Sequence, residues 1–150
     1  MKITTDSIKE LRELTGVSVM QCKKALEEAG GDTQKALAVL KKSSGASALK
    51  KVDRELKASV IGSYTHDGNI GAMALLSCET DFVAKNPEFA AFARDLAMQV
   101  AAMDPENIES LMEQQYIKDG SKNIRNLLDE TTQKFGERVE VTKFMRLSAR

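Results

Sequence analysis

Residues 78–87, with the sequence CETDFVAKNP, join two apolar segments of different periodicity. The apolar run before them, residues 70–77, is typical of a strand, and residues 87–103 carry apolar side chains at helical spacing. A strand-to-helix junction gathers free backbone N–H groups and the positive end of a helix dipole. Asp81 and Phe82 lie side by side at this junction. Because buried aromatic residues mostly belong to a core, Phe82 is either a structural plug or an exposed contact.

The segments around this junction predict a small antiparallel sheet. Residues 58–66 and 70–78 flank an Asp-Gly-Asn sequence, and an Asp-Gly step between two apolar segments favours a hairpin. Residues 139–147 largely alternate apolar and polar side chains, as a third strand would. Between the second and third strands, helices are expected over residues 87–103, 108–112 and 122–135. The predicted fold is therefore α+β, in the order β-β-α-α-α-β, with a three-stranded antiparallel sheet and helices packed on one face.

The second predicted strand, residues 70–78, has apolar side chains on both faces. A strand of this kind favours cover on both sides. The helices can cover one side. We expect the other side to be covered by a partner protein or by a second copy of the chain.

Residues 1–43 predict three short helices. Capping residues stand where each helix would begin: Thr5 or Asp6, Ser18 and Asp32. Small polar residues and then charged residues follow up to position 56, which is typical of a hinge and a linker. The expected organisation is an N-terminal three-helix domain over residues 1–45, a linker over 46–56 and a core domain over 57–150.

Two apolar residues of the second helix, Val19 and Met20, do not fit the core of this bundle. Met20 lies three residues before Lys23, so the two side chains share a face of the helix. Exposed valine and methionine beside a cation indicate a small docking patch. The alternative is that Val19 or Met20 simply closes the bottom of the bundle.

The charge balance argues against nucleic acid as a direct partner. The chain of 150 residues has 22 basic and 22 acidic side chains. Proteins that bind a phosphate backbone normally show a basic excess or a basic stripe. The first residues lack the apolar core of a signal peptide, and no span reaches membrane length, so we expect a cytoplasmic protein without a membrane partner.

Residues suited to covalent chemistry are few. Cys22 and Cys78 stand apart from any CxxC or Cys/His cluster, so we expect buried thiols in a reducing compartment and no metal site. His66 is the one histidine, and no nucleophile motif accompanies it. No glycine-rich phosphate-binding motif occurs. The sequence therefore predicts no cofactor and no enzyme activity.

Three parts of the chain resemble the bacterial elongation factor Ts family. Residues 11–16 (LRELTG), 20–29 (MQCKKALEEA) and 31–32 (GD) resemble the N-terminal module of that family. Residues 79–86 (ETDFVAKN) resemble its core signature, and residues 135–141 (FGERVEV) resemble its closing strand. Together these parts span nearly the whole chain in the family's order and spacing.

The resemblance is to the short form with a single core, because the common form carries a duplicated core and a coiled-coil insertion. It implies an N-terminal bundle of the ubiquitin-associated type. The short form is associated with dimers, some of which are linked by a cysteine near the C-terminus. Residues 144–146 (FMR) contain no cysteine. We therefore expect a non-covalent homodimer formed through the sheet face.

The function implied by the resemblance is that of a guanine nucleotide exchange factor. Such a factor binds elongation factor Tu·GDP and promotes GDP release during translation elongation, without covalent chemistry. The matching motifs imply partner-binding residues in both domains: Arg12, Val19, Met20 and Lys23, and Thr80, Asp81, Phe82 and Val83. Asp81 and Phe82 would form a wedge near the Mg²⁺ and phosphate site of the GTPase, so Phe82 is expected to point outward. The alternative is a docking adaptor of the ubiquitin-associated type without exchange activity.

Overall fold

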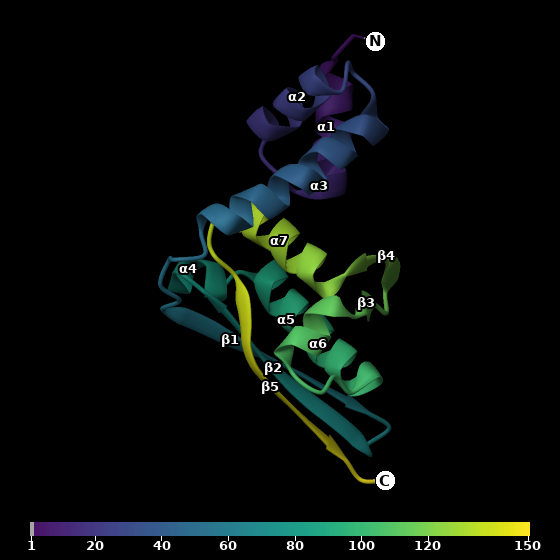
Figure 1. The fold of residues 1–150 in the computed structure, drawn as a ribbon, viewed down its shortest axis with the longest axis vertical. Coiled ribbons are helices and arrows are strands. Elements are labelled where there is room, and N and C mark those ends of the chain that lie inside the picture. The colour runs from purple at the N-terminus through teal and green to yellow at the C-terminus, as the bar shows by residue number, and fades with distance from the viewer. Residues whose placement is uncertain (1) are drawn as a thin grey trace. The chain divides into compact units, whose positions relative to one another are not determined.

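The computed structural model describes residues 2–150, and the chain forms two compact units (Figure 1). One unit comprises the chain up to Val52 together with Asp129–Gly136. The other comprises Asp53–Leu128 and Glu137–Arg150. The chain therefore passes between the two units three times, and we call them the N-terminal unit and the core unit.

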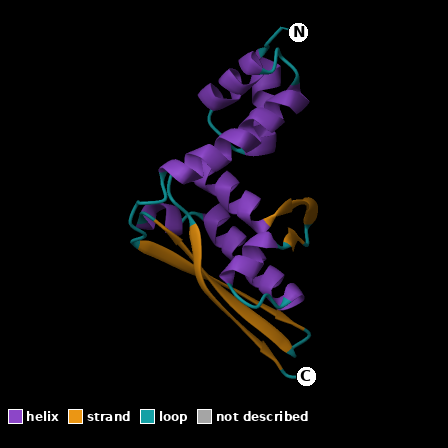
Figure 2. Ribbon diagram, viewed as in Figure 1, coloured by secondary structure: helices purple, strands orange, loops and turns teal. Residues whose placement is uncertain are grey.

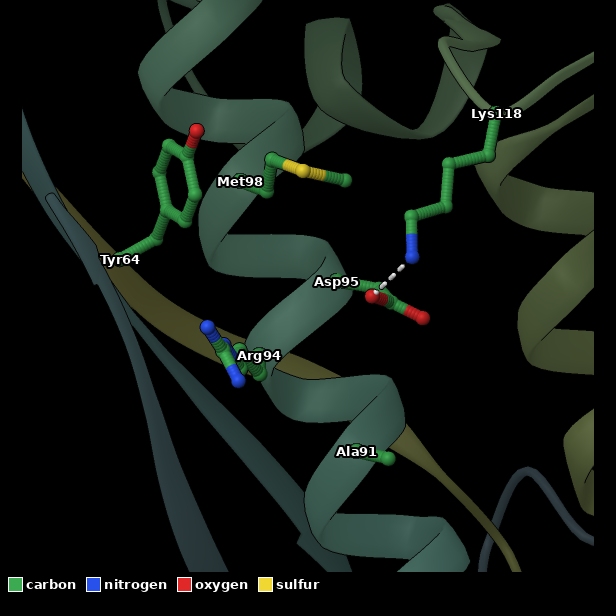
Figure 3. Close-up of a pocket in the computed structure, with 6 residues that line it drawn as sticks. All are labelled: Tyr64, Ala91, Arg94, Asp95, Met98 and Lys118. Atoms are coloured by element: carbon green, nitrogen blue, oxygen red, sulfur yellow. Dashed lines mark hydrogen bonds and ion pairs between the residues drawn. The ribbon is translucent and has the colours of Figure 1, made fainter. Parts of the chain in front are cut away.

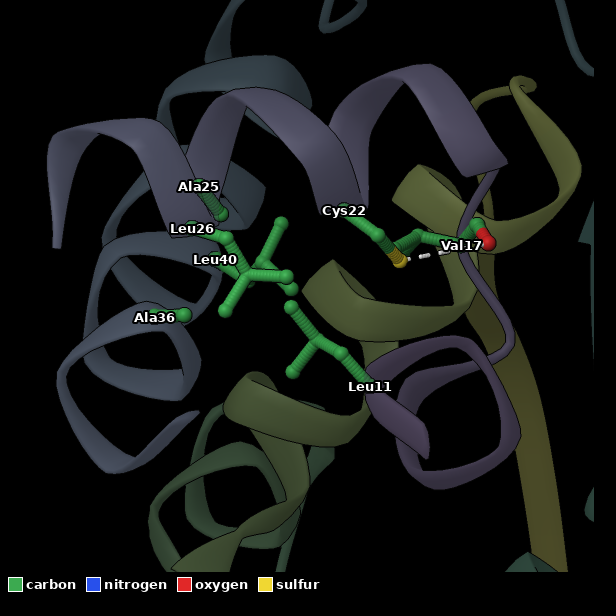
Figure 4. Close-up of a cluster of buried hydrophobic side chains, with 7 residues drawn as sticks. All are labelled: Leu11, Val17, Cys22, Ala25, Leu26, Ala36 and Leu40. Atoms are coloured by element: carbon green, nitrogen blue, oxygen red, sulfur yellow. Dashed lines mark hydrogen bonds between the residues drawn. The ribbon is translucent and has the colours of Figure 1, made fainter. Parts of the chain in front are cut away.

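Three helices, α1 (Thr5–Thr15), α2 (Val19–Glu28) and α3 (Thr33–Lys50), form most of the N-terminal unit. Their buried apolar side chains meet in one cluster, in which Leu11, Cys22 and Leu26 are fully buried (Figure 4). Ser18 and Asp32 cap α2 and α3 as predicted. The first helix is capped by Thr4 rather than by Thr5 or Asp6. The reason is a capping box, in which Thr4 and Ser7 each accept a hydrogen bond from the other's backbone N–H.

The third helix is longer than predicted, because it continues through the small polar residues after position 43 to Lys50. Ser43 and Ser44 remain helical by donating their hydroxyl protons to the carbonyls of Leu40 and Lys41, at 3.0 and 2.8 Å. Gln133 also donates to the Ser43 hydroxyl at 2.9 Å. The serine residues predict the end of the helix when they are considered alone. In the structure their hydroxyls have hydrogen-bond partners within the N-terminal unit, and the helix continues.

The core unit is built on a three-stranded antiparallel sheet. Its strands are β1 (Ala58–His66), β2 (Ile70–Cys78) and β5 (Glu140–Ser148), in the order β1-β2-β5. The first two strands have the predicted bounds. Asp67 and Gly68 at their turn have φ values of 52° and 69°, the left-handed conformation that an Asp-Gly step favours. A register shift between Leu75 and Leu76 interrupts the pairing of β2 with β5.

Helix α5 (Pro87–Met103) packs against the sheet and supplies much of the core, as predicted. Its fully buried residues are Phe89, Ala93, Leu96, Ala97, Gln99 and Val100. The short helices α4 (Asp81–Ala84) and α6 (Ile108–Glu113) flank it, and Figure 2 shows α5 and α6 on the same side of the sheet. The α+β class and the three-stranded antiparallel sheet are therefore confirmed.

A small hairpin, β3 (Gln115–Tyr116) and β4 (Asp119–Asn123), was not predicted. The buried amide of Gln99 explains it, because its nitrogen donates to the Gln115 carbonyl at 3.0 Å and its oxygen accepts the Ile117 N–H at 3.0 Å. Helix α7 (Ile124–Phe135) begins after Asn123, two residues later than the predicted start at residue 122. Gln99, which organises this segment, lies on α5, so the residues of the hairpin themselves do not predict it.

The second face of the sheet carries exposed apolar side chains. Met73 is paired directly with Met145, so the two share this face, and Ile61 and Leu147 lie on it by the same register. All four side chains are exposed. In residues 2–150, no helix has the length and apolar character needed to cross a membrane.

Candidate functional site

The segment between β2 and α5 forms a short, ordered projection from the core unit. We call residues 79–83 the candidate loop. Thr80 caps α4, and its hydroxyl accepts the Val83 N–H at 3.4 Å. Asp81 lies in the first turn of α4, where a negative charge is favourable. Asp81 is exposed, and Phe82 is 88% exposed.

Phe82 points outward because its neighbours are fixed inward. Val83 and Ala84 are 5% and 8% exposed and belong to the core, and Cys78 before the loop is fully buried. A helix of four residues that buries these two side chains leaves the preceding position on its free side. The structure thus shows an exposed aromatic residue here and not a structural plug. Val83, by contrast, is a buried residue of the core.

A carboxylate distant in sequence holds the backbone at the start of the loop. Glu137 Oε1 accepts the N–H groups of Glu79 and Thr80 at 3.1 and 2.9 Å, and its Oε2 accepts the Thr80 hydroxyl at 2.7 Å. Glu137 was not among the residues that the sequence assigned to the site. It lies 57 residues from Thr80, and only its place in the closing motif could have drawn attention to it.

The other expected contact residues lie in the N-terminal unit. Arg12 on α1 and Val19, Met20 and Lys23 on α2 are all exposed. Burial raises the pKa of the Cys22 thiol, and the positive charge of Arg12 opposes that rise. We call these four residues the N-terminal patch. Val19 and Met20 do not close the bottom of the bundle core.

Both thiols are buried and free. Burial is the main cause that raises the pKa of Cys22 and of Cys78, and the nearby carboxylate of Glu137 also raises the pKa of Cys78. A raised pKa keeps a thiol protonated and unreactive at neutral pH. Neither residue is therefore poised as a nucleophile.

A shallow cavity of about 400 Å³ lies against α5 in the core unit (Figure 3). It is lined by Tyr64, Ala91, Arg94, Asp95, Met98 and Lys118. Asp95 is neutralised by Lys118 at 2.7 Å, and the Tyr64 hydroxyl is bonded to His66 Nδ1 at 2.9 Å. These lining residues include no serine or cysteine nucleophile. No group of three or more potential metal ligands occurs within residues 2–150.

The fold is that of an α+β protein, and most of its candidate functional residues are exposed on the two units. A family model described as elongation factor TS matches residues 79–150, starting at the first residue of the candidate loop. Elongation factor Ts of Thermodesulfovibrio yellowstonii is 38% identical over 190 aligned residues, covering 97% of this chain and 96% of the relative. The Thermotoga petrophila protein has the same identity and coverage. Elongation factor Ts of Clostridium kluyveri is 40% identical over 147 residues, covering 97% of this chain and 48% of the relative.

The chain belongs to the elongation factor Ts family. It is therefore a translation elongation factor of protein biosynthesis. The alignments with the first two relatives extend over 190 residues, more than the 150 of this chain, so those relatives contain segments that this chain lacks.

Proposed function

We propose that this chain is a guanine nucleotide exchange factor that binds elongation factor Tu·GDP and promotes GDP release. The observation that carries the proposal is the exposed pair Asp81 and Phe82, presented by a loop whose flanking residues are buried. Membership of the elongation factor Ts family supports it. The site of action is the cytoplasm, where translation takes place.

Exchange of this kind needs differential binding and no covalent step. GDP held at nanomolar affinity is bound by about 12 kcal/mol, so its spontaneous release is slow. An exchange protein that prefers the nucleotide-free GTPase weakens the binding of GDP to the GTPase. GDP weakens the binding of the exchange protein to the same extent, because the coupling between two ligands of one protein is reciprocal. Moving that equilibrium from about 1:99 to 99:1 requires roughly 5.5 kcal/mol of differential affinity. Two separate contact surfaces on one chain can provide it.

Asp81 and Phe82 form the first of these surfaces in our proposal. Phe82 inserts between side chains of the GTPase near its Mg²⁺ and phosphate site, and Asp81 accompanies it as a competing negative charge. Displacing the metal removes positive charge that compensates the GDP phosphates. Thr80 and Val83 contribute by fixing the loop, since one caps α4 and the other is buried in the core.

The N-terminal patch forms the second surface. Arg12 and Lys23 supply charge, and Val19 and Met20 supply apolar area, for contact with the nucleotide-binding domain of the GTPase. In this proposal the three-helix bundle is a docking domain of the ubiquitin-associated type over residues 1–45. The segment that the sequence assigns to a linker, residues 46–56, begins inside α3 and leads to the proposed exchange and dimerisation domain over residues 57–150.

A stopped-flow measurement of fluorescent GDP leaving elongation factor Tu tests the proposal. We expect the wild-type chain to accelerate release, and Phe82→Ala to lower the maximum rate far more than it weakens complex formation. Leu49→Ala is the matched control, because Leu49 is 76% exposed and lies on α3, outside both surfaces. An unchanged maximum rate in Phe82→Ala would show that the wedge assignment is wrong.

A docking adaptor without exchange activity is the second candidate, favoured by the exposed Val19 and Met20 on a helical bundle. It predicts that the chain binds elongation factor Tu equally well with GDP and without nucleotide. Titration of the two forms of the GTPase separates the candidates, because an exchange factor must bind the nucleotide-free form more tightly.

The exposed sheet face supports a further part of the proposal, a non-covalent homodimer. Ile61, Met73, Met145 and Leu147 present an apolar surface that a second copy would cover. We expect Met73→Lys to place a charge at the centre of this interface and to yield a monomer in sedimentation velocity. Ile117→Lys, which alters an exposed residue on the β3–β4 hairpin, is the control. A wild-type chain that sediments as a monomer at all concentrations would refute the dimer.

A further inference from the structure

Hydrogen bonds in both directions join the candidate loop to the segment after α7. Glu137 accepts three bonds from Glu79 and Thr80, at 2.7 to 3.1 Å. In return, Glu79 Oε2 accepts the Arg138 N–H at 2.5 Å. The carboxylates of Glu79 and Glu137 therefore each accept hydrogen bonds from the other segment, across 57 to 59 residues of sequence. Hydrogen bonds to ionised acceptors are roughly twice as strong as neutral ones.

Arg54 and Arg138 add further contacts between the segment before β1, Glu79 and the segment after α7. Arg54 Nη1 lies 3.4 Å from Glu79 Oε2, and Arg138 Nη1 donates to the Arg54 carbonyl at 2.7 Å. The Glu79 side chain is only 21% exposed, so its interactions are partly shielded from solvent. Three chain segments of the core unit thus converge behind the loop and limit its movement.

Phe82 itself cannot set its own direction. Its side chain is 88% exposed and gains little from packing, and the four-residue helix α4 is far too short to be stable alone. The direction of Phe82 must therefore come from Val83 and Ala84 on one side and from the backbone of Glu79 and Thr80 on the other. The second of these supports depends on Glu137.

The Thr80 hydroxyl links Glu137 directly to the helix that carries Phe82. It donates to Glu137 Oε2 at 2.7 Å and accepts the Val83 N–H at 3.4 Å. Glu137 therefore orients the capping group of α4 as well as the backbone before it. A loop held in its bound conformation loses less entropy on binding than a mobile one.

We propose that Glu137 is a positioning residue for exchange, which holds the candidate loop so that Asp81 and Phe82 are presented in one orientation. This rests on the exchange function proposed above. Glu137 need not touch the GTPase. It acts through the loop, so its loss should reduce the maximum rate of GDP release and leave the docking by the N-terminal patch in place.

The first test measures GDP release from elongation factor Tu over a range of factor concentrations. We expect Glu137→Ala to lower the maximum rate at least about tenfold, because it removes three hydrogen bonds to a charged group and the loss of one such bond already corresponds to about that factor. The half-saturating concentration should change less than about twofold. Glu137→Gln keeps an acceptor oxygen for the two amides and should retain most of the rate. Glu140→Ala is the matched control, because the Glu140 carboxylate pairs with Arg125 at 3.5 Å, which lies outside the loop.

A double-variant experiment shows whether Glu137 acts through Phe82. Once Phe82→Ala has removed the wedge, Glu137→Ala should cause little further loss of rate. If Glu137→Ala causes the same loss in both backgrounds, it acts elsewhere and the proposal is wrong. The proposal is equally wrong if Glu137→Ala alone keeps the wild-type maximum rate.

Amide hydrogen exchange followed by NMR tests the clamp without any GTPase. We expect the Glu79 and Thr80 amides to exchange about tenfold faster or more in Glu137→Ala, and at the wild-type rate in Glu140→Ala. Unchanged protection of both amides in Glu137→Ala would overturn the clamp. If the wild-type chain fails to accelerate GDP release, the proposed function and the role of Glu137 in exchange fall together, while amide exchange still decides whether Glu137 holds the loop.

Discussion

Replacing Gly62 with alanine tests how the core unit holds α5 against the sheet. Gly62 lies in the middle of β1, opposite Ala74 on β2. A Cβ atom at this position would overlap the Ala93 carbonyl group and the Arg94 nitrogen, which are backbone atoms of α5. A flexible side chain could move aside, but these atoms can move only if the helix shifts. The absence of a side chain at residue 62 is therefore a condition for the observed packing.

The expected cost follows from this geometry. Adding a methylene to a well-packed core typically costs 1 to 3 kcal/mol, so a clash with rigid backbone should cost about 3 kcal/mol or more. For a chain of this size each kcal/mol lowers the melting temperature by roughly 2 to 4 °C. Gly62→Ala should therefore lower it by about 6 to 12 °C.

Tyrosine fluorescence is a suitable assay, because the two tyrosines, Tyr64 and Tyr116, both belong to the core unit. Thermal and urea unfolding followed by this signal therefore report on the unit that contains Gly62. Gly120→Ala is the control, since nothing lies within 4 Å of a Cβ added there, and its stability should change by less than about 0.5 kcal/mol. If Gly62→Ala unfolds at the same temperature as Gly120→Ala, the close approach of α5 to β1 is not as described.

Two further predictions concern other parts of the chain. Gly45 lies inside α3, where an added Cβ would meet only the Asp129 carboxylate at 3.9 Å. Because alanine favours a helix interior over glycine, Gly45→Ala should stabilise the N-terminal unit by about 0.5 to 1 kcal/mol. Thermal unfolding followed by circular dichroism measures this change. Burial and the neighbouring Asp95 carboxylate raise the pKa of Tyr116 to about 12 from the usual 10. The folded state therefore keeps this proton more tightly than the unfolded state, and stability should fall as pH rises from about 10 towards 12. Urea titrations across this range should show a shallower decline for Tyr116→Phe, and equal slopes would refute this cause.

Local signals were sufficient for the elements whose residues determine their own backbone conformation. The bounds of β1, β2 and α5 agree with the prediction, because an Asp-Gly turn fixes the hairpin and Asn86 with Pro87 fixes the helix start. Interactions across the fold produced the differences. Gln99 organises a hairpin that lies 15 to 18 residues further along the chain, and serine hydroxyls satisfied within the N-terminal unit extend α3.

In the candidate site, too, the sequence predicted some features and the tertiary structure decided others. The sequence placed Asp81 and Phe82 at a strand-to-helix junction, and the resemblance of their motif to elongation factor Ts agrees with the family established by the comparisons. Burial separated Phe82, which is exposed, from Val83, which belongs to the core. These two adjacent apolar residues look alike in a sequence, since only the packing of α4 against the sheet decides which one faces solvent.

The sequence by itself determined the hairpin, the main core helix, the family and the loop, because turn residues, caps and apolar periodicity act over short distances. Only the tertiary structure decided the direction of Phe82 and the partners that fix the loop. Glu137 and Thr80 lie 57 residues apart, yet the Thr80 hydroxyl and the Glu137 carboxylate meet at 2.7 Å. Their contact exists because β2 and β5 are neighbours in the sheet, and this pairing brings the ends of two distant segments together.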